Sequence, residues 1–169
     1  MAVQNLDIPR PRGPDSEAIR ERNKAAVRRI LEAFNTGDTG IIDQLTHPDL
    51  VDLTPPPGTP PGLEGLKHQI GKLREQFPDV HLEEEVIVAE GDTVFMRWKM
   101  TGTNLGRIYG RPPTGRKITH YGHEIIALKD GKIIKHFDTS DVMVFLDKLG
   151  LLDDQMMQAL TRYGVRNYE

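Results

Sequence analysis

Side chains that could move protons or bind a metal ion gather in the second half of the chain. Five of them lie between positions 120 and 138: His120, His123, Glu124, His136 and Asp138. Imidazole and carboxyl groups are the usual general acids and bases of enzymes. A metal site would need at least three of them to converge, and residues spread over two segments are weak evidence for that. The pattern therefore favours proton transfer over metal binding.

Composition disfavours several other chemistries. The chain has no cysteine, which removes thiol nucleophiles, disulfides and thiolate metal ligands. The segment PPTGRK at 112–117 lacks the G-x-x-x-x-G-K-[ST] pattern of a phosphate-binding loop. A formal net charge of −3 without a dense Lys/Arg block disfavours nucleic acid as a partner.

No apolar run approaches the roughly 20 residues that a membrane span needs. The N-terminus also lacks the apolar stretch of a secretory signal. We therefore expect no membrane partner and a cytoplasmic location.

Periodicity predicts two amphipathic helices in the first half of the chain. The first is capped by Asp15 or Ser16 and stopped by Gly37 in a left-handed conformation. Its apolar stripe consists of Ile19, Ala26, Val27, Ile30, Leu31 and Phe34. The second helix is predicted over 63–77, after a proline-rich surface loop at 54–62 that cannot be a helix or a central strand.

From residue 80 onward the apolar period changes to two, which predicts strands. Four of them follow in succession, at 81–89, 93–102, 118–128 and 132–138, after a shorter extended piece at 50–53. Short helices are predicted at 141–149, where Asp141 could act as the cap, and at 153–163. Helices followed by antiparallel strands predict an α+β domain with helices on one face of a curved sheet. The predicted units are an extended arm at 1–14, the domain at 15–152 and a helical extension at 153–169.

Several segments occur in the order typical of one family: ILEAFNTGD, HPDLVD, REQFPDV, AEGDTVFMRWKMTGT, GRPPTGRKI and KDGKIIKHFDTSDVMVFLDKLG. Over about 23–150 the chain resembles SnoaL-like polyketide cyclases, which are members of the NTF2-like superfamily. The resemblance implies an NTF2-like cone, in which a curved antiparallel sheet wraps around N-terminal helices. It also implies a homodimer or homotetramer and catalysis without a metal or cofactor.

The resemblance further implies a reaction. Characterised cyclases of this family close a ring by intramolecular aldol condensation of a polyketide methyl ester, a small hydrophobic carbonyl substrate. Their acid/base is an aspartate two residues after the histidine of a GKIxxHxD-like segment, which is Asp138 here. The histidine that assists this aspartate in the family is replaced by Glu124, and the family's GTH segment ends in Asn104 instead. These departures concern the site and leave the fold untouched.

The turn at 129–131 decides which side chains face Asp138. A three-residue loop would place Gly122 opposite Asp138, Glu124 opposite His136, and His120 diagonally near Asp138. A two-residue turn would place His123 opposite Asp138 instead. We favour the first register, because it puts Glu124 and Asp138 on the same face.

The candidate catalytic residues are Asp138, Glu124 and His120. The candidate substrate-binding residues are Phe34, Gln69, Trp98, Asn104, Tyr121, His123 and His136, of which Phe34 and Gln69 match positions that line the family's pocket. His120 and His123 must point to opposite faces of one strand, so at most one lies in the pocket. For Trp98 and Tyr121 the alternative is plain core packing, and for Glu124 it is an ion pair with Lys135 or Arg97.

Two other functions remain open. Isomerisation, dehydration or epoxide hydrolysis could be carried out by carboxylates in the same apolar pocket. The second alternative is a cone that only binds a small hydrophobic ligand, because fold does not settle function.

Overall fold

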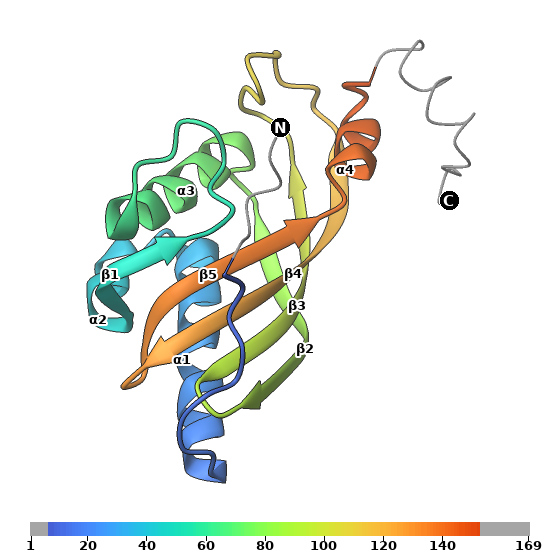
Figure 1. Cartoon of the computed structure of the whole chain (residues 1–169). Coiled ribbons are helices and arrows are strands. Elements are labelled where there is room, and N and C mark those ends of the chain that lie inside the picture. The colour runs from blue at the N-terminus through green and yellow to red at the C-terminus, as the bar shows by residue number, and fades with distance from the viewer. Residues whose placement is uncertain (1–6, 153–169) are drawn as a thin grey trace.

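The computed structural model describes residues 7–152 (Figure 1). The predicted helix at 153–163 and the extension around it lie outside the described residues. The elements are α1 (Glu17–Thr36), η1 (Thr39–Ile41), α2 (Ile42–Leu45), β1 (Thr46–Asp52), α3 (Gly62–Gln76), β2 (His81–Glu90), β3 (Thr93–Thr103), β4 (Lys117–Lys129), β5 (Lys132–Ser140) and α4 (Val142–Leu149). Within residues 7–152, no helix is both long and apolar enough to cross a membrane.

Both ends of α1 follow the local signals of the sequence. The Ser16 hydroxyl accepts the N–H of Ile19, which satisfies one of the free donors of the first turn. At the other end Gly37 adopts φ 81° and donates its N–H to the Ala33 carbonyl. The predicted caps of this helix are therefore confirmed.

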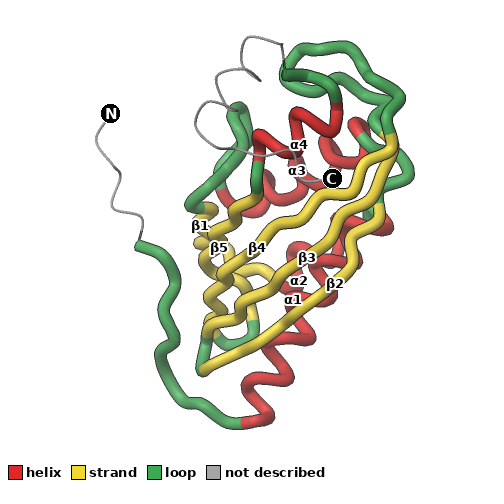
Figure 2. Tube along the Cα trace, turned by 90° about the vertical axis from the view of Figure 1, so that its right-hand side faces the viewer, coloured by secondary structure: helices red, strands yellow, loops and turns green. Residues whose placement is uncertain are grey.

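The sheet has the order β1-β5-β4-β3-β2, and helices α1, α2 and α3 lie on one side of it (Figure 2). Strands β2 to β5 are antiparallel neighbours, whereas β1 runs parallel to β5. The extended piece predicted at 50–53 is thus the end of a longer strand that completes the sheet. This arrangement confirms the α+β fold with a curved sheet around N-terminal helices.

The core lies between the helices and the inner face of the sheet. Along β3, the buried side chains alternate with partly exposed ones, as the period of two requires: Val94, Met96, Trp98 and Met100 point inward. Gly122 on β4 leaves space for the Trp98 ring, because a Cβ built at Gly122 would lie 2.1 Å from it. This close approach explains the glycine in the middle of a central strand.

The β4–β5 hairpin has a register that neither sequence-based alternative predicted. Asp130 and Gly131 form a two-residue turn with φ values of 52° and 79°, and Lys129 pairs with Lys132. Ladder pairing then shifts between Ala127 and Leu128, which leaves Ile134 as an extra residue on β5.

This bulge changes the partners of the predicted site residues. Glu124 lies opposite Asp138, Gly122 opposite Ser140, and His136 opposite Ile126. The prediction that Glu124 and Asp138 share one face is confirmed, but the position of His120 diagonal to Asp138 is wrong. The added residue also removes His123 from the place opposite Asp138 that a regular two-residue hairpin would give it.

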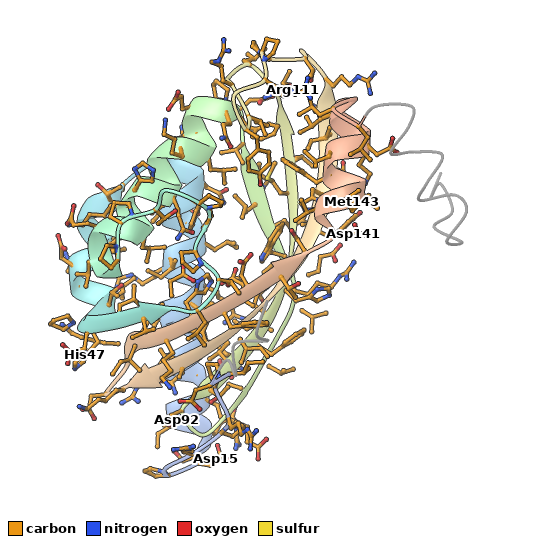
Figure 3. The ribbon with its side chains drawn as sticks, turned by 45° about the horizontal axis from the view of Figure 1, so that its top comes forward. Asp15, His47, Asp92, Arg111, Asp141 and Met143 are labelled. Atoms are coloured by element: carbon orange, nitrogen blue, oxygen red, sulfur yellow. The ribbon has the colours of Figure 1, made fainter. Side chains whose placement is uncertain are left out.

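The N-terminal segment 7–14 contains no helix or strand and is joined to the sheet at two places. Arg12 and Asp92 exchange backbone and side-chain hydrogen bonds at the β2–β3 turn, and the Asp7 carboxylate pairs with Lys135 on β5. Figure 3 shows Asp92 near Asp15 at the start of α1, and the Asp15 carboxylate accepts the N–H of Gly91 at 3.1 Å.

Candidate active site

A cavity of about 650 Å³ lies between the helices and the inner face of the sheet. Much of its lining is apolar and comes from α1, α3, β3 and β4, including Ile30, Phe34, Leu66, Met96, Trp98 and Ile126. Residues of the proline loop, Pro56, Pro57 and Thr59, and Tyr109 of the loop after β3 add to the wall. The cavity is large enough for a flat organic molecule of drug size.

Polar groups of the cavity wall gather where β1, β4 and β5 meet. The His136 imidazole lies between two carboxylates, with Nδ1 3.4 Å from Asp52 Oδ1 and Nε2 3.2 Å from Glu124 Oε2. The side chains of His136, Asp52 and Glu124 are only 19, 13 and 15% exposed, respectively, so water screens their interactions weakly. We call Asp52, His136 and Glu124 the charged triplet.

The charged triplet holds a proton on His136. Burial alone would lower the pKa of His136, but hydrogen bonds and negative charge from Asp52 and Glu124 outweigh it and raise the pKa to about 10. The ring is therefore an imidazolium at neutral pH, and each nitrogen donates to one carboxylate.

Asp52 is held as a carboxylate by the same contacts and two others. Its Oδ1 accepts the N–H of Thr54 at 3.0 Å, and its Oδ2 accepts from Gln69 Nε2 at 2.8 Å. Burial raises the pKa of Asp52, yet the hydrogen bonds from His136, Thr54 and Gln69 and the imidazolium charge lower it overall. Asp52 therefore serves as a fixed counter-ion of His136.

Asp138 lies beside the charged triplet and shows the opposite shift. Burial and the negative charges of Glu124 and Asp52 raise the pKa of Asp138, against the lowering effects of the His136 charge and of a hydrogen bond from Thr54. The carboxyl group also lines the apolar cavity. The raised pKa and the place in the cavity wall make Asp138 the candidate group for exchanging a proton with a bound molecule.

The arrangement does not resemble a metal centre. Among residues 7–152, no three His, Asp or Glu side chains are placed to hold a metal ion together. Both ring nitrogens of His136 are directed at carboxylates and carry protons, so the imidazole offers no lone pair. The geometry suits proton transfer to and from a molecule in the cavity.

Comparison with known proteins adds a family to this geometry. The family model described as SnoaL-like polyketide cyclase matches residues 24–149. The chain belongs to the SnoaL-like polyketide cyclase family.

Named relatives of this SnoaL-like chain are cyclases. It is 32% identical to the nogalonic acid methyl ester cyclase of Streptomyces nogalater over 123 residues, which cover 72% of this chain and 92% of the relative. It is also 32% identical to the aklanonic acid methyl ester cyclase AcmA of Streptomyces galilaeus, over 75% of this chain and 89% of the relative. The solved structure of TsrD from Streptomyces laurentii superposes with a TM-score of 0.68 at 29% identity, covering 76% of this chain and 98% of TsrD. The chain is thus similar to polyketide cyclases over most of their length.

The cavity of this SnoaL-like chain brings together most of the site residues predicted from sequence. Seven of the ten line it: Phe34, Gln69, Trp98, His120, Glu124, His136 and Asp138. Gln69 contacts Asp52 rather than standing alone, and Glu124 pairs with His136. The alternative ion pairs of Glu124 are wrong, because Lys135 pairs with Asp7 and Arg97 with Glu85.

Tyr121 and His123 lie outside the cavity, and the prediction that they contact substrate is corrected accordingly. Both face the outer side of β4, because side chains alternate along a strand and His120 points inward. The Arg97 guanidinium lies 5.0 Å from the centre of the Tyr121 ring and donates to His123 Nε2 at 3.0 Å. The two residues therefore organise the outer surface of the sheet.

Asn104 also lies outside the cavity lining. It is fully buried, and its side chain donates to the carbonyls of Gln76 and Gly106 and accepts the N–H of Thr114. An amide with this many backbone partners holds the loop after β3 in place. Its predicted role in substrate binding is replaced by a structural one.

His120 lines the cavity but is separated from Asp138. Its ring packs between Trp98, at 5.9 Å between centres, and Phe145, at 4.9 Å. Burial and the positive charge of Lys148 lower the pKa of His120 to about 4, against a weaker effect of Asp141. Within the described residues, no hydrogen bond joins His120 to the charged triplet or to Asp138, so the geometry gives it no part in their proton transfer.

Two residues of the site were not predicted from sequence, namely Asp52 and Thr54. Asp52 stands in the segment HPDLVD that carries the family resemblance, which was the available signal. Thr54 opens the proline loop, where no pattern indicates a contact with a strand 84 positions later.

Proposed function

We propose that this chain catalyses intramolecular aldol ring closure of a polyketide methyl ester or a similar hydrophobic carbonyl compound, with Asp138 as the base and without a cofactor. The observation that carries the proposal is the carboxyl group of Asp138, which has a raised pKa and lies in the wall of an apolar cavity. A carboxylate whose pKa is raised by burial and by negative neighbours is a stronger base than a free one.

The proposed steps need one proton shuttle. The Asp138 carboxylate takes a proton from a carbon flanked by two carbonyls, and the resulting enolate attacks a carbonyl carbon of the same molecule. A carbon–carbon bond forms, and the new alkoxide takes back the proton from Asp138. Because the two carbonyls and the conjugated rings spread the enolate charge, a carboxylate is a strong enough base.

The charged triplet supports the assignment of Asp138 as the base, because the charge of His136 stays constant. His136 is held as an imidazolium between Asp52 and Glu124, so it keeps its positive charge while Asp138 changes protonation. Two neighbouring negative charges also keep Asp138 basic enough to accept a proton. Glu124 acts as a counter-ion in this scheme, and not as a second acid.

Relatives and cavity together support the substrate class. Two curated relatives at 32% identity are named for nogalonic and aklanonic acid methyl esters. A cavity of about 650 Å³ with a largely apolar wall fits a polycyclic compound of this kind.

The test compares Asp138→Asn with Asp130→Asn, a matched change in the exposed β4–β5 turn. Turnover of nogalonic or aklanonic acid methyl ester is measured for each variant, together with thermal unfolding. The proposal expects Asp138→Asn to lose at least about 100-fold in kcat while it stays folded, because a general base is removed, and Asp130→Asn to match the wild type. Full turnover by Asp138→Asn would overturn it.

Binding can be followed separately, because Trp98 is the single tryptophan of the chain and lines the cavity. Quenching of its fluorescence by the methyl ester should be alike in the wild type and in Asp138→Asn. A wild-type protein that binds the ester without converting it would favour a ligand-binding role over catalysis.

A further inference from the structure

The two residues that follow β1, Leu53 and Thr54, are hydrogen-bonded to β5 next to the site. Leu53 donates its N–H to the His136 carbonyl at 2.8 Å, and Thr54 forms two contacts with Asp138. The Asp138 N–H donates to Thr54 Oγ1 at 2.9 Å, and the same hydroxyl lies 3.3 Å from Asp138 Oδ1. Backbone and carboxyl of Asp138 are therefore both held by one side chain.

The direction of these hydrogen bonds follows from the donors available. A hydroxyl has one proton and two lone pairs. Because the Asp138 N–H occupies a lone pair of Thr54 Oγ1, the hydroxyl proton is free to be donated to Oδ1. This contact engages one carboxyl oxygen of Asp138 and favours the ionised form of the group.

The other carboxyl oxygen is in a different situation. Within the described residues, Asp138 Oδ2 has no hydrogen-bond partner, and Thr46 Oγ1 is the buried side-chain atom that lacks one. Oδ2 is therefore not sealed inside the protein, and Asp138 contributes to the cavity wall. The two oxygens of this carboxylate are thus chemically distinct before any substrate binds.

We infer that Thr54 is a positioning residue that fixes Oδ1 of Asp138 and leaves Oδ2 as the oxygen that exchanges the proton. This inference rests on the proposed function, because it assigns the atom that acts in that reaction. The proton moves from the substrate carbon to Oδ2 and from Oδ2 to the alkoxide, while Oδ1 keeps its contact with Thr54.

Thr54 is itself held by the charged triplet. Its N–H donates to Asp52 Oδ1, whose carboxylate also contacts His136 and Gln69. The Thr54 hydroxyl is therefore held in a fixed position. Removing this hydroxyl would free the Asp138 carboxyl group to rotate. An orienting contact of this kind raises the rate by increasing the fraction of molecules in a reactive geometry.

The charged groups that face Asp138 are Asp52 from β1, Glu124 from β4 and His136 from its own strand. Other titratable side chains of the cavity wall are His68, Lys72, Glu75, Arg107, Tyr109 and His120. None of these is altered by a change at Thr54, so a shift in the titration of Asp138 reports the lost hydroxyl.

The test uses Thr54→Val, which keeps the shape and removes the hydroxyl, and Thr54→Ser, which keeps the hydroxyl. Thr139→Val is the matched control, since Thr139 follows Asp138 on the exposed side of β5. We expect kcat of Thr54→Val to fall about tenfold with KM nearly unchanged. The acid limb of its pH–rate profile should move to higher pH, because a hydrogen bond to the ionised carboxylate is lost. Thr54→Ser should restore both quantities, and Thr139→Val should leave them as in the wild type.

A second readout does not depend on turnover. The carboxyl carbon of Asp138 is titrated by NMR in each variant, and its signal is assigned by its absence in Asp138→Asn. A higher pKa in Thr54→Val and a wild-type value in Thr54→Ser support the inference, whereas equal values in all variants overturn it. If Thr54→Val does not fold, Thr54→Ala replaces it in the same comparison. Full turnover by Asp138→Asn together with a shifted titration in Thr54→Val would reject the proposed function and retain the contact of Thr54.

Discussion

His136 and His120 lie in the wall of the same cavity, on neighbouring strands, and have opposite protonation states. Burial lowers the pKa of both rings. At His136 two carboxylates reverse this effect and bring the pKa to about 10. At His120 the neighbours are the rings of Trp98 and Phe145 and the cation of Lys148, and the pKa falls to about 4.

The contrast shows that partners, and not depth, decide what a buried histidine does. His136 is partly buried and charged, whereas His120 is buried and neutral. A charged ring orders the polar end of the cavity, and a neutral one extends its apolar wall. The same residue type thereby gives the cavity a charged end at His136 and an end for packing at His120.

The largest expected effect comes from removing the charged ring. His136→Gln leaves Asp52 and Glu124 without their shared cation, and breaking a mostly buried ion pair costs about 3 to 5 kcal/mol. We expect the free energy of unfolding at pH 7 to fall by about that amount, measured by urea denaturation. His120→Gln, the same change at the other end of the cavity, should cost clearly less, and equal losses would contradict the contrast.

The pH dependence of this loss has a defined sign. The folded pKa of His136 lies above the ordinary value near 6.5, so its contribution is complete below about 6.5 and disappears as the pH rises toward 10. The difference in stability between wild type and His136→Gln should therefore shrink between pH 7 and pH 10. A difference that stays constant over this range would show that His136 is neutral.

The second prediction concerns His120 on the acid side. Its folded pKa is about 4, so the unfolded chain binds more protons there than the folded one between pH 6.5 and pH 4. Wild-type stability should lose up to about 3 kcal/mol from this residue as the pH falls through that window. His120→Phe keeps an aromatic ring between Trp98 and Phe145 and should remove this loss. The matched control is His81→Gln at an exposed histidine at the start of β2, and the acid limb of His120→Phe is compared with that of this variant.

Local signals predicted the elements of this fold well. Apolar periods and cap residues predicted α1 with Ser16 and Gly37 at its ends. Residues 129–131 marked the place of the hairpin, although its turn has two residues and not the three that we favoured. These signals act over a few residues, where propensity and hydrogen bonding are decided by neighbours in sequence.

The pairing of distant residues was not predictable in the same way. The bulge at Ile134 slides β5 by one residue against β4, and no residue type in the hairpin requires it. The partner of His136 on β1, Asp52, and the partner of Asp138 just after β1, Thr54, are also far away in the sequence. The site residues of β5 could be named from sequence, but the contacts that set their charges depend on tertiary packing.

The smallest expected effect is at Asp141, which links the packing end of the cavity to α4. Its carboxylate accepts the N–H of Val144 at 3.0 Å as the helix cap, at the junction of β5 and α4 (Figure 3). Asp141→Ala should lower the free energy of unfolding by about 1 kcal/mol, because a capping hydrogen bond is lost. Asp141→Asn keeps an acceptor for this hydrogen bond and should lower the free energy of unfolding by only about 0.3 kcal/mol.

Charge gives the same pair of variants a second use. The negative charge of Asp141 favours the protonated form of His120, so both variants should lower the pKa of His120 slightly further. An NMR titration of His120 measures this directly. Because only Asp141→Ala loses the cap, a pKa change in both variants with a stability change in one separates the electrostatic effect from the structural one. A pKa of His120 that stays unchanged in both would assign its protonation state to burial and Lys148 alone.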